Sequence, residues 1–504
     1  MTTNEAALGD GPDAVLIVFG NQLFHPRHLP APREVRVLLV EDQAMCTRYA
    51  WHQQKLALVL GAMRDYQSTL TRSGYLVTYH ALDEGLDWQR ALERLIALGV
   101  RRMVHFEVES PALAKALTAF ALRHECGLKA LRSPMFLGTR ADFDAHLAEQ
   151  GVPRMANFYR AQRERTGILM GATGTPVGGR FSFDPDNRER LPRELVPPAP
   201  MEIEPTAAAS AVRRLVADRF SEHPGSLDSA WVPTSHAQAE SWLDDFLVNR
   251  FHHFGTYEDA LTERSPFVYH SALAPLLNIG LLTPDRVLDR ALEFGARESV
   301  PLNSLEGFVR QILGWREFVR GVFHHYYDPM QSRNIWRAER KLTPAWYTGD
   351  TGIAPLDHVI HKTLRFGWAH HIERLMVAAN LMNLAGIQPQ EVYRWFMEMF
   401  VDAYDWVMVP NVFGMGLTSD GGIFTTKPYI CGSNYLRKMG DYAPGPWCDV
   451  MDGLLWRFVA NHETTLRANN RLAPMVANLA RVARKRPEIF ALAEDFIETH
   501  TRAA

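Results

Sequence analysis

The chain has 504 residues, which is too long for one ordinary domain and predicts two to four of them. With 47% hydrophobic and 22% charged residues, its composition is that of soluble globular proteins and excludes a disordered or fibrous class. The net charge of −3 provides no overall attraction to nucleic acid or to acidic membranes, so any contact with DNA requires a local basic patch.

The cysteine pattern and the hydropathy suggest a cellular compartment. Four cysteines are spread along the chain without a CxxC pair, so the spacing typical of zinc or iron-sulfur sites is missing. No charged-then-apolar leader precedes the first apolar run, and no uncharged apolar stretch is long enough to span a bilayer. We therefore expect a cytoplasmic protein with reduced thiols and no membrane contact.

The first 150 residues alternate between strand-like and helix-like patterns. Residues 14–19 (AVLIVF) form a continuous apolar run that ends at Gly20, as expected of a buried parallel strand. A helical pattern covers residues 45–73, and further strands are predicted at residues 35–40, 75–79, 103–106 and 128–131. This alternation predicts an α/β domain with a parallel sheet over residues 12–150.

The pattern changes after residue 150. Residues 178–200 (GGRFSFDPDNRERLPRELVPPAP) are rich in glycine, proline and charge, which favours an interdomain linker over residues 151–234. From residue 235 to residue 504 almost every segment has helical periodicity, which predicts a large all-α domain. Its amphipathic stretches include residues 238–248, 283–294, 305–323, 356–384 and 389–400.

Residues 362–386 (KTLRFGWAHHIERLMVAANLMNLAG) are the most informative stretch of that domain. At helical spacing, His371, Arg374 and Ala378 recur on one face, so a polar pair would line an otherwise apolar wall. The alternative is a core helix whose histidines are hydrogen-bonded and have no further role.

Three adjacent histidine pairs, His252-His253, His324-His325 and His370-His371, raise the question of a metal site. Neighbouring side chains on a helix diverge by about 100°, so such a pair does not converge on one ion. There is also no HExxH motif. We therefore expect no bound metal.

Residues 401–415 (VDAYDWVMVPNVFGM) place acidic and amide side chains among aromatics. Asp402, Asp405 and Asn411 lie where a helix is expected to give way to a loop at Pro410. Carboxylates at such a place can bind ribose or the edge of a flavin ring. A capped helix end with solvated acids is the alternative, and the residues alone do not separate the two.

Basic and aromatic residues are interleaved in the C-terminal half. Such a mixture suits base stacking combined with phosphate pairing, although each residue alone is more often an exposed charge beside a core aromatic. The residues are Arg310, Arg316, Lys341, Arg365, Lys427, Arg437 and Lys438, with Trp315, Trp336, Trp346 and Tyr435.

The first strand is not followed by a glycine-rich phosphate loop. Neither GxGxxG nor GxxxxGK[ST] occurs there, and the sequence has FGNQL instead. A standard NAD- or ATP-dependent enzyme is therefore disfavoured.

Five motifs, in one order between residues 14 and 479, closely resemble the bacterial (6-4) photolyases, also called the iron-sulfur bacterial cryptochromes and photolyases. The motifs are FGNQL (19–23), GGRFSFD (178–184), EGFVRQILGWREFVRG (306–321), WAHHIERLM (368–376) and DAYDWVMVPNVFGM (402–415). The resemblance implies the architecture of the photolyase/cryptochrome superfamily. That architecture is a Rossmann-like α/β antenna domain followed by an all-α domain that binds FAD.

The same resemblance implies a set of cofactor-binding residues. FAD would lie U-shaped in the helical domain, with Tyr257, His270, Ser271, Ala272 and Leu273 near its phosphates. Arg374, Asp405 and Asn411 would approach the isoalloxazine ring. A lumazine-type antenna chromophore is implied near Gly20, Asn21 and Glu41.

The catalytic implication concerns the second histidine of the pair His370-His371. His371 occupies the place of the lesion-facing histidine of (6-4) photolyases, a general acid or hydrogen-bond donor to the damaged base, and His370 lies beside it. The implied reaction is electron donation from light-excited reduced FAD to a flipped-out pyrimidine photoproduct in UV-damaged DNA. We expect a monomer.

The chain departs from its branch at the iron-sulfur cluster. None of the four cluster-binding cysteines is present where the motifs align: Pro355, Ala443 and Pro446 stand at such places, and Cys448 lies near the fourth without companion thiolates. Because a cluster needs about four ligands, we predict that none is bound.

Two further departures concern the flavin environment. Trp395 matches an aromatic of the electron relay, but Phe396 stands where tyrosine is usual and Tyr347 where tryptophan is usual, so electron transfer is expected to be slower or rerouted. Met408 takes a place where some members carry a glutamate near the flavin.

The sequence therefore predicts light-dependent repair of UV-induced pyrimidine photoproducts in DNA, of the (6-4) type. The first alternative is a cryptochrome-like blue-light photoreceptor that binds FAD without repair activity, which the altered relay and the missing cluster favour. The second is a helical nucleic-acid-binding protein that has lost the flavin. A yellow preparation with a flavin spectrum would exclude the second alternative.

Overall fold

The computed structural model describes residues 12–503, which divide into two compact units. Among the described residues, the first unit consists of residues 12–137, 201–244 and 272–290. The second consists of residues 138–200, 245–271 and 291–503.

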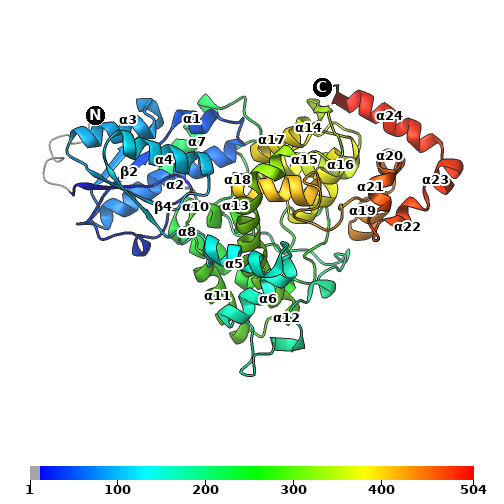
Figure 1. Ribbon diagram of the computed structural model, residues 1–504, viewed down its shortest axis with the longest axis horizontal. Helices are drawn as coiled ribbons and strands as arrows, with labels where there is room; N and C mark the ends of the chain where they lie inside the picture. Colours follow the sequence, from blue (N-terminus) through cyan, green and yellow to red (C-terminus); the bar gives the residue numbers. More distant parts are fainter. Residues whose placement is uncertain (1–11, 504) are drawn as a thin grey trace. The chain divides into compact units, whose positions relative to one another are not determined.

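A five-stranded parallel sheet forms the centre of the first unit (Figure 1). The spatial order is β3-β2-β1-β4-β5, with β1 (Ala14–Ile17), β2 (Arg36–Val40), β3 (Val77–His80), β4 (Arg102–Phe106) and β5 (Gly127–Leu131). The order reverses beside β1, as in doubly wound nucleotide-binding folds. The prediction of an α/β domain with a parallel sheet is confirmed.

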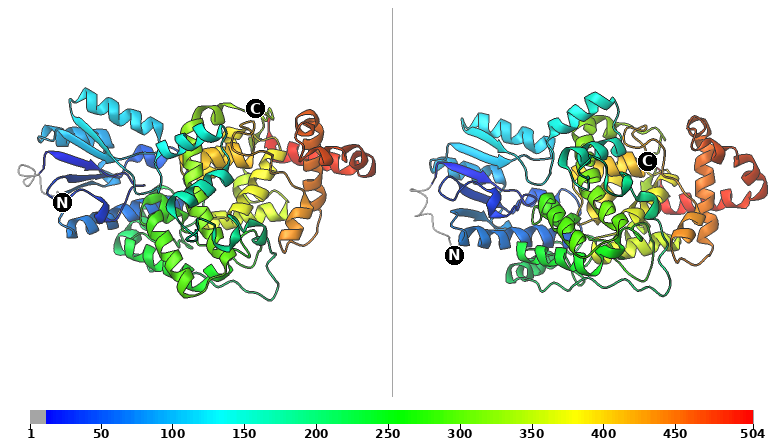
Figure 2. Two further views of the ribbon diagram at one scale, coloured as in Figure 1. Left: turned by 60° about the horizontal axis from the view of Figure 1, so that its bottom comes forward. Right: turned by 90° about the horizontal axis from the view of Figure 1, so that it is seen from below.

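Helices lie on both faces of this sheet (Figure 2), which explains why the central strand β1 is apolar and fully buried. On one face, Val15 and Ile17 of β1 pack in one core cluster with Leu92 of α3 (Trp88–Ala97) and Phe120 of α4 (Pro111–Arg123). Side chains alternate along a strand, so Leu16, which is fully buried, points to the opposite face.

The boundaries of the units differ from those expected. Residues 151–234 are not one linker, because they include α6 (Met155–Thr166) in the second unit and α7 (Ala207–Arg219) in the first. α7 packs on α2 (Gln53–Arg72), and its N-cap Thr206 donates its hydroxyl to Asp65 of α2. Prolines and glycines are frequent in this stretch, but the helices between them bury apolar residues. Each of these helices therefore belongs to one of the two units and not to a linker.

The second unit is almost entirely helical, as the periodicity from residue 235 predicts. Its helices include α12 (Leu302–Val309), α13 (Glu317–Ser332), α15 (Ala354–Phe366), α17 (Pro389–Met399), α20 (Trp447–Asn461) and α24 (Glu488–His500). Within the described part of the chain, no helix is both long and apolar enough to cross a membrane.

The helix predicted over residues 356–384 is interrupted. α15 ends at Phe366 because Gly367 takes the left-handed φ of +59° and closes the helix with a hydrogen bond to the Thr363 carbonyl. Residues 368–370 are not helical, and the next helix begins at His371. His370 and His371 are therefore not neighbours on one helix, so the divergence expected for an adjacent pair does not apply to them.

The prediction that a helix gives way to a loop at Pro410 is wrong. α18 (Asp405–Met408) continues into the π-helical segment η8 (Val409–Gly416), which contains this proline. Proline has no N–H to donate, and a wide π-turn accommodates the missing bond. The Asn411 side chain donates to the Val407 carbonyl at 2.8 Å.

Close packing of α20 on α24 depends on a glycine. A Cβ atom on Gly453 would lie 2.0 Å from the backbone oxygen of Ile489, which cannot rotate away as a side chain would. We expect Gly453→Ala to lower the free energy of unfolding by about 1–3 kcal/mol, measured by urea denaturation. Gly127→Ala, whose Cβ would have no neighbour closer than 3.8 Å, is the control. Equal stability of the two variants would contradict this account of the packing.

Candidate active site

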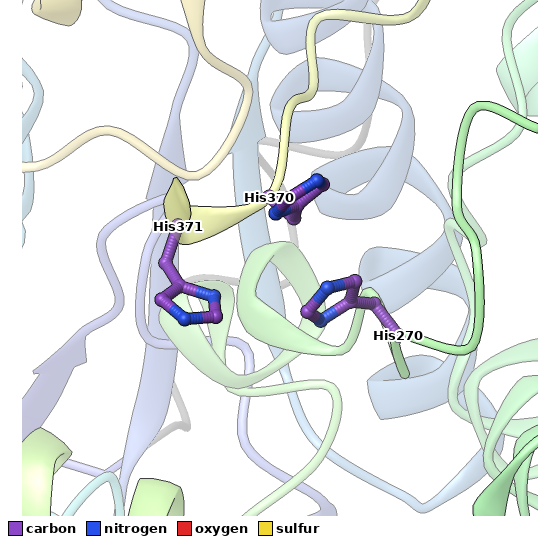
Figure 3. A group of neighbouring side chains, drawn as sticks. All are labelled: His270, His370 and His371. Atoms are coloured by element: carbon purple, nitrogen blue, oxygen red, sulfur yellow. The ribbon is translucent and has the colours of Figure 1, made fainter. Parts of the chain in front are cut away.

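Three imidazoles from two segments meet in the second unit (Figure 3). His270 lies in the loop before residue 272, His370 in the non-helical residues after Gly367, and His371 at the start of the following helix. One ring nitrogen of each lies within 4.8 Å of the other two. The rings of His270 and His370 are stacked, with centroids 4.8 Å apart and planes inclined by 15°.

His270 and His370 are buried polar groups with unused hydrogen-bonding capacity. Three ring nitrogens have no hydrogen-bond partner among the residues that the structure describes. They are both nitrogens of His370 and the Nε2 of His270. Glu373 Oε2 lies 3.6 Å from His370 Nε2, which is too far for a hydrogen bond. Burial lowers the pKa of both imidazoles well below the ordinary value, and neighbouring positive charge lowers it further. Both rings are therefore neutral.

His371 has the opposite character. Its side chain is 49% exposed, and its Nε2 lies 3.2 Å from Asp259 Oδ1. Burial alone would lower the pKa of His371, but the hydrogen bond and charge of Asp259, together with Glu258, outweigh it and raise the pKa. Because half of the ring reaches solvent, its loss of hydration is modest, which supports the same direction. His371 can thus carry a proton near neutral pH.

A buried charge cluster positions the loop that carries Asp259. Arg310 lies 3.2 Å from Asp184, 3.4 Å from Glu306 and 3.6 Å from Glu258. Glu306 also accepts the backbone N–H of Phe183 at 2.8 Å. Asp184 and Phe183 belong to the GGRFSFD motif and Glu306 and Arg310 to the EGFVRQ motif, so these motifs act as structural partners.

A second ion pair lies on the helix that begins at His371. Arg374 forms a bidentate pair with Asp402, at 2.9 and 3.0 Å, and its guanidinium lies 4.0 Å from the Phe400 ring centroid. Asp405 accepts the Tyr393 hydroxyl at 2.6 Å, and its assignment to the flavin ring remains a prediction. The carboxylate that forms an ion pair with Arg374 is therefore that of Asp402.

Comparison with known families begins with two family models. The model described as deoxyribodipyrimidine photo-lyase-related protein matches residues 16–231. The model described as FAD binding domain of DNA photolyase matches residues 308–432.

One curated relative matches most of the chain, and a second matches a shorter region. A (6-4) photolyase of Agrobacterium fabrum is 32% identical over 468 residues, which is 89% of this chain and 91% of the relative. The chain belongs to the photolyase/cryptochrome family. A deoxyribodipyrimidine photo-lyase of Streptomyces griseus is 30% identical over a shorter region, 26% of this chain and 29% of the relative.

Solved structures of the photolyase/cryptochrome family share the fold. A bacterial class III photolyase from Agrobacterium tumefaciens superimposes with a TM-score of 0.56 at 17% identity, covering 98% of this chain and 100% of that one. A cryptochrome of Synechocystis gives a TM-score of 0.55 at 15% identity over 93% and 90% of the two chains. At these identities the likeness supports the fold alone.

The side chains of the helical unit fit the FAD that the photolyase/cryptochrome family implies. Free nitrogens of His270 and His370 are buried donors and acceptors that no described protein group uses, and a polar cofactor would satisfy them. Tyr257, whose ring stacks on Tyr269 at 5.6 Å, and Ser271 lie in the same unit as these histidines.

The backbone around His270 is strained. Val268 and Ala272 both take left-handed φ values, +50° and +51°, which a β-branched residue rarely adopts. Such strain persists only where its surroundings impose it, and it is common at ligand-binding sites. Ala272 and Leu273, also expected near the flavin phosphates, open the segment that belongs to the first unit.

The residues that the resemblance assigns to an electron relay lie inside the second unit. Trp395 is fully buried, donates its indole N–H to the Trp346 carbonyl at 2.8 Å, and packs on Phe400 with ring centroids 5.7 Å apart. Tyr347 donates its hydroxyl to Glu398 at 2.8 Å, and burial raises its pKa. Phe400 connects this aromatic group to the Arg374 guanidinium.

The residues proposed for an antenna chromophore lie in the first unit. Glu41 is buried and accepts hydrogen bonds from Arg64 at 2.6 and 2.8 Å and from the Leu82 N–H at 2.8 Å. Its carboxylate is therefore largely committed within the unit. The assignment of Gly20, Asn21 and Glu41 to a lumazine chromophore remains a prediction.

Some residues proposed for nucleic-acid contact have structural roles instead. Arg310 is buried among carboxylates, and Trp336 and Trp346 donate their indole N–H groups to backbone carbonyls at 2.7 Å. Arg437 and Lys438, in the last turn of α19 (Ser433–Met439), are exposed and remain available for phosphate contact.

Among the described residues, the group of side chains that could hold a metal ion consists of the three histidines. An imidazole directs its lone pair in the plane of the ring, so the stacked rings of His270 and His370 must turn before both can reach one ion. Among the described residues, no cysteine belongs to a group of three or more potential metal ligands. We therefore still expect that the protein binds no resident metal ion and no iron-sulfur cluster.

Elemental analysis tests that expectation. Burial raises the pKa of the Cys431 thiol to about 12, which disfavours the thiolate that iron needs. Iron, zinc and sulfide measured on the purified full-length protein are expected at well below one equivalent per chain. A value of about four irons per chain would show that a cluster is bound.

The raised pKa of His371 is expected to depend on Asp259. Asp259→Asn removes the charge, so the pKa of His371, followed by NMR on histidine-labelled protein, is expected to fall. The stabilisation from this pair is present below the ordinary histidine pKa of about 6.5 and is lost as pH rises through the raised value. Asp144→Asn, which alters the similar pair with His325, is the control. An unchanged His371 pKa in Asp259→Asn would refute the assignment.

Proposed function

We propose that this protein repairs (6-4) pyrimidine photoproducts in UV-damaged DNA in a light-dependent reaction. The observation that carries the proposal is the pairing of a half-exposed, charge-stabilised His371 with two buried neutral imidazoles. The (6-4) photolyase relative at 32% identity supports the same lesion type.

The two histidines of the pair have different tasks in this proposal. His371 lies 3.2 Å from Asp259, which raises its pKa, so it can carry a proton and donate it to a damaged base. His370, buried and neutral, donates its backbone N–H to Glu373 at 2.9 Å and keeps the turn before His371 in place. Glu373 is in turn held by Lys362 at 2.6 and 2.7 Å.

FAD would be held by Tyr257, His270, Ser271 and Arg374, and its reduced form supplies an electron on excitation. The Arg374 guanidinium is fixed by Asp402, so a positive charge stands at a defined place in the unit. Trp395 and Phe400 extend from this arginine as an aromatic path. Tyr347, tied to Glu398, would be a branch of that path.

Replacement of His371 tests the proposal. His371→Ala removes the proton donor, and repair of (6-4) lesions in an oligonucleotide under blue light is expected to fall by about 10²–10⁴-fold. FAD content, read from the flavin spectrum, is expected to stay unchanged because the half-exposed ring contributes little to the core.

His325→Ala is the matched control, since His325 also lies 3.3 Å from an aspartate and is 43% exposed on its side chain. Its repair rate is expected to equal that of the unaltered protein. Undiminished repair in His371→Ala would remove His371 from the reaction.

A blue-light photoreceptor is the second candidate. It is favoured by Tyr347, because a hydrogen-bonded tyrosine at a relay position suits a slow, proton-coupled photoreduction. Absence of lesion loss with fully reduced flavin in the unaltered protein would favour the receptor over the repair enzyme.

A further inference from the structure

The first unit contains a cavity lined by polar side chains. None of the three clustered histidines lines it. The cavity has a volume of about 870 Å³. His25, Arg27 and His28 reach it from the segment after β1, Arg72 from the end of α2, and Thr283 from the turn before α11 (Pro284–Arg297). None of the proposed antenna residues lines it.

The acidic residues of this cavity are already paired. Glu240 accepts hydrogen bonds from Arg286 at 3.0 Å through each carboxylate oxygen. Asp65 accepts the hydroxyls of Thr206 and Thr234, at 2.9 and 2.6 Å, and its charge offsets part of that of Arg72.

Two guanidinium groups are less committed. Arg27 lies 3.9 Å from Asp285, and both side chains are about half exposed, which makes a weak pair. The contact of Arg72 with Thr69 Oγ1 is long, at 3.5 Å. The cavity therefore has a surplus of accessible positive charge.

The histidines of the cavity present N–H donors. His25 Nδ1 accepts the backbone N–H of Arg27, and His28 Nε2 accepts the Nε–H of Arg27. In the neutral rings the hydrogen must then lie on the other nitrogen, so His25 Nε2 and His28 Nδ1 are donors. Donors of this kind suit an anion and not a cation.

Two further features point to an anion. The first turn of α8 (His236–Asn249), a helix of 14 residues, faces the cavity with His236 and Ala237, and a helix N-terminus favours negative charge. Thr283 is 4% exposed, and among the residues that the structure describes its hydroxyl has no hydrogen-bond partner. A buried hydroxyl without a partner is costly unless a ligand supplies one.

We propose that this cavity binds a small phosphate-bearing molecule, held by Arg27 and Arg72 with the histidine donors and the Thr283 hydroxyl. Arginine pairs with phosphate oxygens through charge-assisted hydrogen bonds. The volume exceeds that of inorganic phosphate and admits a nucleoside monophosphate. The site is independent of the flavin and of the repair reaction.

Calorimetric titration of the full-length protein, with its chromophores bound, tests the site with inorganic phosphate and with AMP as separate probes. Binding of one AMP per chain, tighter than phosphate, is expected and would identify a nucleotide-type ligand. Equal affinities would identify the phosphate group alone. The double variant Arg27→Gln and Arg72→Gln is expected to weaken binding by about tenfold or more. Arg123→Gln, at an exposed arginine at the end of α4, is the control for the loss of an arginine outside the cavity and is expected to bind normally.

Thr283→Val separates a ligand role from a packing role. Valine keeps the shape, so the thermal unfolding midpoint without ligand is expected not to fall, while binding weakens about two- to tenfold. Lower stability with unchanged binding would overturn the role of Thr283. No binding of either probe, equal binding by the double variant, or displacement of AMP by a short oligonucleotide would overturn the proposal.

Discussion

The buried charge cluster around Arg310 is the constraint on which the helical unit depends. Its carboxylates, Asp184, Glu258 and Glu306, come from segments far apart in the chain. A buried guanidinium needs these partners, since removal of one partner of a buried ion pair costs about 3–5 kcal/mol. The residue after Glu258 is Asp259, so the cluster also determines where the carboxylate that controls His371 lies.

The three imidazoles of the site differ in protonation state because their environments shift the pKa in opposite directions. Desolvation keeps His270 and His370 neutral, whereas Asp259 keeps a proton on the half-exposed His371. In this arrangement His371 can donate a proton, whereas the neutral imidazoles of His270 and His370 are not acids. The left-handed φ values at Val268 and Ala272 indicate that the surroundings impose a strained conformation on the loop of His270.

Local patterns were sufficient for much of the fold. The apolar run at residues 14–19 and its successors predicted the five parallel strands, because buried strands need side chains that are apolar on both faces. Helical periodicity likewise predicted the second unit. The assignment of residues 151–234 as a linker did not anticipate α6 and α7, because the affinity of a short helix for a distant partner such as α2 is not a property of its own composition.

The sequence by itself determined the family, through motifs in a fixed order, and it predicted functional roles for His371 and Arg374. Only the tertiary structure decided their partners: Asp402 and not Asp405 pairs with Arg374, and Asp259 binds His371. It also brought His270 against His370, although the two residues come from separate segments of the chain. The physical reason is that hydrogen bonds and ion pairs form between side chains that are close in space, and spacing along the chain reveals only those within one helix or strand.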